Sequence, residues 1–437
     1  MMTNVEAGAP SPTLPRRTGE GGTQRVVVPI SLPTLPMAAI SPSHPNIHPA
    51  SLPPANVQAL YVHIPFCFHK CHYCDFYSIT RQTPERMANF VELILREADL
   101  WTSDNKATSA PIRTIFFGGG TPSLLPLEAM RQLLQGIHQR FDLSELEEWT
   151  VEVNPASAAL DYCRMLREHG VDRLSFGAQS FNINELKTLE RHHDPADVPR
   201  SIELARQAGF ERLNVDLIYA IPGQDQASWG ASLASALALK TPHVSCYNLT
   251  YETNTPMAVR KRLGHFTAVD EETELAMFRQ AREQLVAAGL AAYEISNYCM
   301  PSEECRHNLV YWTGGNYIGV GPSAASHVEG HRWRNRPHLG EWEKAVAGGD
   351  VPVADGEILS PSQRAGELAM LLLRLSRGVR YADFAAKTGL DARAVFAEQI
   401  ARLGRVGLLV ADENAIRLTE KGIGLADAIA AEFLESA

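Results

Sequence analysis

The sequence lacks the features of several common protein classes. Seven of its 437 residues are cysteine, and three of these share one short run, so a disulfide framework is not expected, whereas a reducing compartment and a metal site are. Basic residues are too few for a nucleic-acid partner, since 40 Lys and Arg face 50 Asp and Glu. No apolar run is long enough to span a bilayer, and the N-terminus has no compact apolar core of the signal-peptide kind.

Hydrophobic residues make up 45% of the chain, which predicts a large core with more than one structural unit. Residues 1–56 are rich in Pro, Ser, Thr and Ala and have no sustained period, so we expect a disordered extension. The remaining chain divides into a core over 57–254, a region over 255–350 that completes the core, and a C-terminal helical domain over 351–437.

Short β-rich runs alternate with amphipathic helical runs between residues 60 and 250. This order predicts parallel strands joined by right-handed crossovers, and six such units close only part of a (β/α)8 ring. The expected strands are Leu60–Ile64, Ile112–Phe117, Trp149–Val153, Arg173–Phe176, Leu213–Tyr219 and Val244–Leu249. The expected helices are Glu85–Trp101, Pro126–Phe141, Leu160–His169, Val198–Ala208 and Gln226–Leu239.

The last part of the chain predicts several helices followed by a short β-rich end. This order is similar to a winged helix, but it carries no dense basic stripe, so we favour a packing or partner-binding role over DNA binding. A further helix, Glu271–Ala288, precedes a run dense in Tyr, Trp, Asn and Gly. The C-terminal elements expected are Ala369–Leu375, Tyr381–Thr388, Ala392–Leu403, Gly407–Val410 and Ala415–Leu418.

The most informative motif is the run with Cys67, Cys71 and Cys74, spaced C-x3-C-x2-C directly after the first expected strand. A [4Fe–4S] cluster takes one thiolate per iron, so three cysteines leave one iron open. An open position lets a metal site bind a small molecule, and the natural candidate is S-adenosylmethionine (SAM), a source of radical chemistry. There are two alternatives. The thiolates and one of three nearby histidines could bind zinc, or two of the cysteines could form a dithiol redox pair. The histidines are His63, His69 and His72.

Polar and glycine residues follow the next strands at the edge where ligands gather in such folds. Gly118, Gly119 and Gly120, followed by Thr121, would let a ligand approach the backbone, with N–H groups free to bond it, although a glycine run alone is more often just a tight turn. Later strand ends carry carboxylates and amides, each of which is also a common helix cap. These are Glu152, Asn154, Gln179 and Asp216. Arg191 is placed to neutralise a carboxylate or to form an exposed ion pair.

A second motif, His307-Asn308-Leu-Val-Tyr311-Trp312, lies in the aromatic-rich region. Imidazole is a common ligand of heme iron, and aromatic faces can stack on a macrocycle. Cys305 is a rival ligand, and core packing with a hydrogen-bonded structural histidine is the alternative reading of the whole motif.

Together these motifs resemble the radical SAM superfamily, and within it the branch similar to oxygen-independent coproporphyrinogen III oxidase. The segments are YVHIPFC-x3-C-x2-C, GGGTPS, EVNP, SFGAQS, DLIYAIPGQ and YEISNY. The resemblance covers nearly all of the chain beyond residue 57 and implies an α/β fold: a partial (β/α)6 radical-SAM barrel with a winged-helix-like C-terminal domain. It implies Cys67, Cys71 and Cys74 as cluster ligands. It also implies that SAM is bound by Tyr61, Gly119, Gly120, Thr121, Glu152, Gln179, Arg191 and Asp216.

One departure separates two members of this branch. The oxidase has a fourth cysteine where this chain has Phe76, while the HemW-type heme chaperones have an aromatic residue there and a later H-N-x-x-Y-W motif. The chain therefore resembles the heme chaperones, which implies that it binds heme through residues such as His307, Asn308, Tyr311 and Trp312. The alternatives are the oxidase, which decarboxylates propionates, and a zinc-stabilised interaction protein.

The resemblance also implies partners and a location. We expect heme to be passed to recipient hemoproteins that are membrane-associated respiratory enzymes. We further expect a homodimer and a cytoplasmic protein with peripheral membrane association. We expect the cluster to serve dimerisation or gating of heme transfer, without coproporphyrinogen oxidase activity.

Overall fold

The computed structural model describes residues 47–102 and 110–434. The predicted disordered extension over 1–56 lies mostly outside these residues. Its last ten residues are described, and they contain a 3-10 helix, Pro49–Ser51. Ile47, just before it, is 3% exposed and packs into the main core. The part of the extension that the structure describes is therefore ordered against the core.

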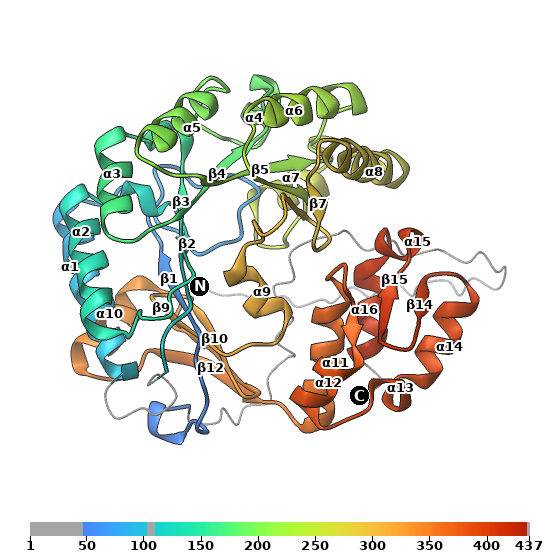
Figure 1. Cartoon of the computed structure of the whole chain (residues 1–437). Helices are drawn as coiled ribbons and strands as arrows, with labels where there is room; N and C mark the ends of the chain where they lie inside the picture. Colours follow the sequence, from blue (N-terminus) through green and yellow to red (C-terminus); the bar gives the residue numbers. More distant parts are fainter. Residues whose placement is uncertain (1–46, 103–109, 435–437) are drawn as a thin grey trace, which may run out of the picture.

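Six parallel strands in chain order form the centre of one large sheet, and helices α1 to α6 follow them in an arc along one side (Figure 1). Strand and helix alternate as the apolar patterns predict. The strands are β1 (Ala59–Ile64), β2 (Thr114–Gly119), β3 (Glu148–Val153), β4 (Arg173–Gln179), β5 (Arg212–Tyr219) and β6 (His243–Asn248). The helices are α1 (Pro84–Thr102), α2 (Leu127–Arg140), α3 (Leu160–Glu168), α4 (Ile183–Thr188), α5 (Asp197–Gln207) and α6 (Gln226–Ala238).

Six further strands extend the sheet at both edges, so it has twelve strands in the order β12-β11-β10-β9-β1-β2-β3-β4-β5-β6-β8-β7. Strand β9 pairs in parallel with β1, and the other added strands pair antiparallel. The sheet does not close on itself, which confirms the partial barrel. The added strands are β7 (Ala291–Ala292), β8 (Asn297–Cys299), β9 (Tyr317–Val320), β10 (Ala325–Val328), β11 (His331–Asn335) and β12 (Val353–Ile358). Strand β12 lies beyond the predicted boundary at residue 350.

Side chains alternate between the two faces of the central strands. On β1, Leu60, Val62 and Ile64 join the core beneath the helices. On the opposite face the residues are polar and bond to one another across strands, as Ser175 does to Asp216 at 3.0 Å and Asn214 to Ser175 at 2.7 Å. This period-2 alternation gives the sheet an apolar outer face and a polar inner face.

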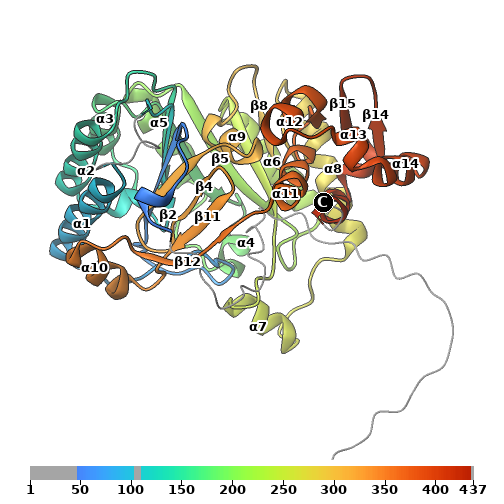
Figure 2. The ribbon, with the colours of Figure 1, turned by 90° about the horizontal axis from the view of Figure 1, so that it is seen from below.

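The C-terminal region lies beside the sheet and has its own core (Figure 2). It consists of helices and a small sheet in the order β13-β15-β14, which confirms the predicted winged-helix-like order. Helix α9 (Arg306–Trp312) contacts both β2 and α11 and so joins the two parts. The elements are α11 (Pro361–Leu373), β13 (Val379–Arg380), α12 (Tyr381–Thr388), α13 (Ala392–Val395), α14 (Ala397–Arg405), β14 (Leu409–Ala411), β15 (Ala415–Leu418), α15 (Glu420–Ile423) and α16 (Ala426–Leu434).

Three other helices surround the large sheet: α7 (Pro256–Arg262), α8 (Glu271–Ala287) and α10 (Leu339–Gly348). Helix α10 packs on α1, and α8 packs on α6. None of the helices in the described ranges is long and apolar enough to cross a membrane.

Candidate cluster and cofactor site

The cysteine loop begins where β1 ends, at the carboxyl edge of the parallel strands. Two backbone bonds close its base, from Cys67 N–H to Ile79 O at 2.9 Å and from Ile79 N–H to Pro65 O at 2.7 Å. Cys67, Cys71 and Cys74 are all partly exposed, and none of them is in a disulfide. Burial raises the pKa of Cys74 to about 12, and the neighbouring thiols add to the shift. The loop therefore presents three free thiols from one closed segment.

The spread of the thiols suits a cluster better than a single ion. A tetrahedral zinc ion holds thiolate sulfurs about 2.3 Å from the metal and hence about 3.8 Å from one another. The three cysteine sulfurs are not among the groups of described residues whose ligand atoms all lie within 4.8 Å of one another. A [4Fe–4S] cluster, in which each thiolate binds a different iron, does not need the sulfurs to be that close. His63, one candidate zinc ligand, is already bonded through both ring nitrogens, to Tyr61 Oη at 3.0 Å and Tyr77 O at 2.9 Å.

The glycine run after β2 packs against the base of this loop. A Cβ on Gly119 would lie 2.5 Å from the His63 ring, and one on Gly120 would lie 2.7 Å from Phe66 O. The N–H groups of Gly120 and Thr121 donate to Ile64 O at 2.8 Å and Phe66 O at 2.7 Å. The sequence predicts that these N–H groups are free to bind a ligand. In the structure they are not free, because both bond to the base of the cysteine loop. Thr121 Oγ1 also lies 3.6 Å from Cys67 Sγ.

Two carboxyl groups sit on the polar inner face of the sheet, beneath the loop. Burial raises the pKa of Glu152 to about 8, and the charge of Asp216 adds to the shift. Burial also raises the pKa of Asp216, although Ser245, Asn214 and Ser175 donate hydrogen bonds that oppose the shift. A Cβ on Gly118 would lie 3.1 Å from the Glu152 carboxyl, so this glycine makes room for it. Such a pair of desolvated acids is suited to a cationic ligand.

Arg191 and Gln179 meet at the end of β4. Gln179 has a φ of 64° where the strand register shifts, which turns its amide back over Gly177. Arg191 donates to Gly177 O at 2.5 Å and to Cys71 Sγ at 3.8 Å, so its partner here is a thiol rather than a carboxylate. Its buried Nε has no hydrogen-bond partner. An orphaned donor of this kind is suited to an acceptor on a bound molecule.

Tyr61, from the middle of β1, lies on the same inner face. Its hydroxyl bonds to His63 Nδ1, and burial raises its pKa. The structure therefore brings most of the residues predicted for SAM together at the carboxyl ends of the strands, around the mouth of the partial barrel. Tyr61 and Asp216 lie deeper in the barrel, in the middle of β1 and β5. SAM has a sulfonium and an ammonium group, and the two buried acids and the orphaned Arg191 Nε fit its charges. When bound, it would supply the 5′-deoxyadenosyl group for radical chemistry.

The second motif lies at the opposite end of the strands. Helix α9 starts at the amino edge, where the Glu148 carboxylate at the beginning of β3 accepts from the N–H groups of Arg306 and His307, each at 3.0 Å. Arg212 Nη2 donates to the same carboxylate at 2.9 Å. Glu148 thus caps α9 and fixes it beneath the barrel, away from the cysteine loop, which follows the other end of β1.

Each residue of this motif has a different surrounding. His307 is fully buried, and its ring nitrogens bond to Thr114 Oγ1 at 2.9 Å and Tyr311 Oη at 2.7 Å. Trp312 packs into the C-terminal core, with the Arg374 guanidinium 4.9 Å from its ring centre. Asn308 is half-buried. The predicted heme contacts of these four residues stay a prediction, and an iron bond to His307 requires one of its hydrogen bonds to open.

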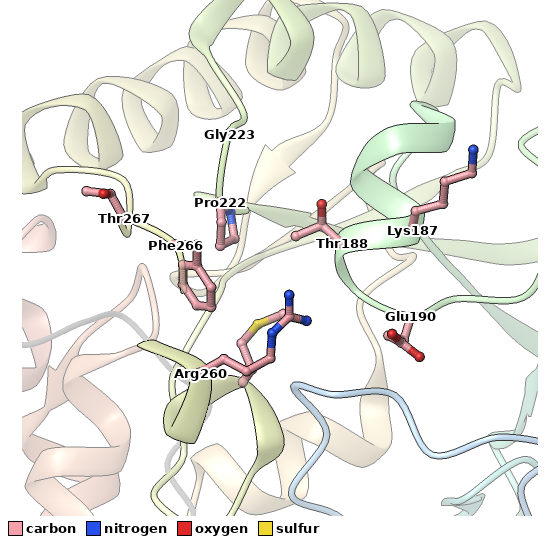
Figure 3. A pocket seen from close by; sticks show the side chains of 9 residues that line it. Lys187, Thr188, Glu190, Pro222, Gly223, Arg260, Phe266 and Thr267 are labelled. Atoms are coloured by element: carbon pink, nitrogen blue, oxygen red, sulfur yellow. The ribbon is translucent and has the colours of Figure 1, made fainter. Parts of the chain in front are cut away.

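A cavity of about 600 Å³ lies beside the cysteine loop. Its wall includes the buried Met257 and the partly buried Phe266, and Arg260 extends from α7 into the space near Phe266 and Glu190 (Figure 3). Met257 N–H donates to His72 O at 3.0 Å, so the cavity adjoins the loop directly. None of these cavity residues is marked in the sequence, because they come from loops and a short helix with no periodic signal.

Comparisons with known proteins decide the family. The model of the radical SAM superfamily matches residues 61–235, and that of the HemN C-terminal domain matches residues 359–425. Heme chaperone HemW of Lactococcus lactis is 34% identical over 374 residues, covering 86% of this chain and 96% of that protein. The chain belongs to the HemW family. Heme chaperone HemW of Bacillus subtilis is 33% identical, over 86% of this chain and 99% of that protein.

Solved structures agree with the fold of a HemW-family protein. Coproporphyrinogen III oxidase (HemN) from Escherichia coli, described as a radical SAM enzyme, superposes with a TM-score of 0.76 at 22% identity. The match covers 88% of this chain and 92% of that chain, so the C-terminal domain is shared as well as the sheet. Phe76, at the position where the sequence resemblance puts the oxidase's fourth cysteine, is 62% exposed on the loop.

Proposed function

We propose that this chain is a heme chaperone that binds a [4Fe–4S] cluster, SAM and heme and passes the heme to other proteins. Two observations together support the proposal. The cysteine loop has three free thiols and is followed by Phe76, and the chain matches nearly the whole length of relatives that are named heme chaperones. The membrane-associated respiratory recipients, the homodimer and the cytoplasmic location are parts of the same proposal.

The residues assigned to the cluster are Cys67, Cys71 and Cys74, and Arg191 supplies the positive charge beside Cys71. The SAM site is assigned to the mouth of the barrel and its polar inner face. Glu152 and Asp216 face the positive part of the ligand there, and the buried Arg191 Nε is free to donate to a negative part.

Heme is assigned to α9, with His307 Nε2 as the iron-binding atom. Its partner Tyr311 Oη is on the same short helix and would have to turn away, whereas the Nδ1 partner Thr114 is fixed on a central strand. Tyr311 also contacts Tyr317 edge to face, with ring centres 4.6 Å apart, which gives a macrocycle an aromatic surface to stack on.

If heme is not held there, we assign it to the cavity beside the cysteine loop. Met257 and Phe266 give that cavity an apolar wall, and Lys187 and Arg260 are cations suited to propionates. Arg260→Gln would then lower heme affinity, and His307→Ala would not.

The test of the whole proposal is anaerobic reconstitution with iron and sulfide, followed by two separate assays. Hemin titration of the loaded protein should reach a stoichiometric end point and the heme should move to an apo-hemoprotein. Incubation with coproporphyrinogen III, SAM and a reductant should leave the substrate's carboxylates intact. Decarboxylation would instead assign the oxidase activity, and failure to bind hemin would reject the chaperone.

A further inference from the structure

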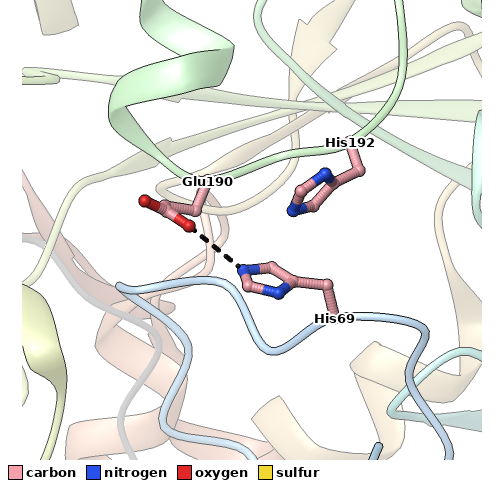
Figure 4. Close-up of side chains that lie close together, drawn as sticks. All are labelled: His69, Glu190 and His192. Atoms are coloured by element: carbon pink, nitrogen blue, oxygen red, sulfur yellow. Dashed lines mark ion pairs between the residues drawn. The ribbon is translucent and has the colours of Figure 1, made fainter. Parts of the chain in front are cut away.

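His69, Glu190 and His192 form a second group of possible metal ligands, on the outer side of the cysteine loop. One ligand atom from each lies within 4.8 Å of the others. His69 comes from the cysteine loop, while Glu190 and His192 come from the segment that follows α4 (Figure 4). In the sequence, His69 stands out only as a possible partner of the cysteines, and nothing connects it with the other two residues.

The spacing between His69 and Glu190 fits a shared metal ion. Nε2 of His69 and Oε2 of Glu190 are 3.3 Å apart, within ion-pair distance (Figure 4), yet the buried Nε2 makes no hydrogen bond. Two ligands of a tetrahedral zinc ion, each about 2.0–2.1 Å from the metal, lie about 3.3–3.4 Å from one another. The pair is thus at the separation of two ligands of one ion, without the geometry of a hydrogen bond between them.

His192 supplies the third ligand. Its ring centre is 4.3 Å from that of His69, with the planes at 72°. Rings this close leave no room for a macrocycle between them, which argues against axial heme ligation by the pair. His192 is exposed, so its ring can rotate toward the other two ligands without disturbing the core. Two histidines and one glutamate are the protein ligands of known catalytic zinc sites, which keep a further position open.

The backbone aims these side chains in an unusual way. Glu190 has a φ of 57°, in the left-handed region that residues other than glycine seldom adopt. The side chains of residues 190 to 192 point alternately to two sides. Arg191 points to Cys71, while Glu190 and His192 reach His69 on the other side. The same two segments therefore meet twice, once at the thiols and once at this group.

The neighbouring charges are mixed. His72 Nδ1 lies 3.7 Å from the other oxygen of Glu190 and 3.3 Å from Arg260 Nη1. Arg260 thus adjoins His72, while Oε2 of Glu190 faces His69. This arrangement leaves one carboxylate oxygen and two imidazoles for a cation.

We propose that His69, Glu190 and His192 bind one first-row divalent cation of the zinc type, which links the cysteine loop to the segment that carries Arg191. The group is separate from the three cysteines and does not depend on heme binding. Imidazole and carboxylate ligands with an open position suit Zn²⁺ or Fe²⁺ and do not select Mg²⁺ or Ca²⁺.

The test uses the full chain with its iron–sulfur cluster already loaded, so that the thiols are occupied. Anaerobic calorimetric titration with ZnCl₂, followed by metal analysis after gel filtration, should give one zinc per chain with no loss of iron. His192→Asn and Glu190→Gln should each weaken zinc binding by roughly tenfold or more. His265→Asn is the matched control, because this exposed histidine lies outside the group, and it should bind zinc as the parent does.

Three results would overturn the proposal. These are the absence of zinc binding at micromolar concentrations, equal affinities in His192→Asn and His265→Asn, and iron released as zinc binds, which would place zinc at the cysteines. A parallel hemin titration covers the remaining alternative. If His192→Asn lost heme and kept zinc, the histidine would be a heme contact and the zinc site would be rejected.

Discussion

Arg191 Nη1 lies 3.8 Å from Cys71 Sγ and reaches the cysteine loop from the segment after α4. The thiol at the middle of the loop thus faces a fixed positive charge. The same guanidinium is anchored on Gly177 O, so the position of the loop and the end of β4 are coupled. A cluster with net negative charge would be stabilised by this contact.

Cys71→Ser is expected to remove the visible absorbance of the reconstituted cluster and to leave the fold intact. Cys71 is partly exposed, so its replacement opens no core cavity. Absorbance near the cluster bands, iron content and the circular dichroism melt are the measurements. Cys163→Ala is the control, because Cys163 is a buried cysteine outside the loop and its variant should keep the absorbance. Full absorbance in Cys71→Ser would reject the ligand assignment.

Binding of SAM at pH 7 is expected to release close to one proton from Glu152. The pKa of this carboxyl is raised to about 8, so it is mostly protonated at pH 7, and a cation placed beside it favours the ionised form. Calorimetry in buffers of different ionisation enthalpy measures the release. At pH 9, above the raised pKa, the release should largely disappear. Glu152→Gln should show almost none at pH 7, and a parent-like value in that variant would assign the proton to another group.

Tyr311→Phe is expected to keep or strengthen heme binding, whereas His307→Ala should weaken it by roughly tenfold or more, equivalent to at least about 1.4 kcal/mol. The first change frees Nε2 of His307, and the second removes the ring. Hemin affinity and the position of the Soret band are the measurements.

Thr114→Val is the matched control for these variants. It removes the Nδ1 partner of His307 but leaves the ring, so it reports the structural cost of losing one buried hydrogen bond. If His307→Ala and Thr114→Val alter heme binding equally, His307 acts through packing and the iron is held elsewhere.

Glu148→Ala is expected to lower the free energy of unfolding by about 3 kcal/mol, at the low end for a broken buried ion pair, because Arg212 loses its fully buried partner but keeps Asp172 and Glu303. The Glu148 side chain is fully buried, and that of Arg212 is 16% exposed. The variant also loses the cap of α9. Urea unfolding monitored by circular dichroism measures the change, and Glu147→Ala, next to it but partly exposed, is expected to cost far less.

The Glu148 contribution is also expected to depend on pH. Burial acts to raise the pKa of Glu148, but Arg173 and Arg212 outweigh it, so the pKa is lowered from 4.5. A lowered pKa means that the ionised form is the one stabilised by folding. This contribution is therefore present above pH 4.5 and is lost as the pH falls through the lower value of the folded state. The difference in stability between the parent and Glu148→Ala should shrink in acid; a constant difference would contradict the ion-pair explanation.

The six central strands could be predicted from the sequence to within about three residues, the largest error being the end of β4 at Gln179, because each is an apolar run between turn residues and an amphipathic helix. The strands from β9 to β12 could not. Strands β9 to β11 lie in a run rich in Tyr, Trp, Asn and Gly, and all four strands join the sheet through the pairing of β9 with β1, far away in the sequence. The helix α9 was also missed, since its start depends on Glu148 from another element.

The candidate site was partly predictable for a similar reason. The cysteines and the strand-end residues are marked by spacing and by position after each strand. The partners of Gly120, Arg191 and His307 are not marked, because each bonds to a residue brought near only by the fold. The link from His69 to Glu190 spans more than 100 residues and had no sequence signal.

The parallel pairing of β1 with β9 has a consequence for synthesis of the chain. Ala59 pairs with Tyr317, so one edge of β1 has no partner until more than 250 further residues have left the ribosome. An unpaired strand edge is a template for association with other chains. The cysteine loop follows β1 and is synthesised early. The strand β1 that supports it gains its second neighbour, β9, only much later. Until β9 pairs, the strand that carries the cysteine loop therefore has an open edge to which another chain can add.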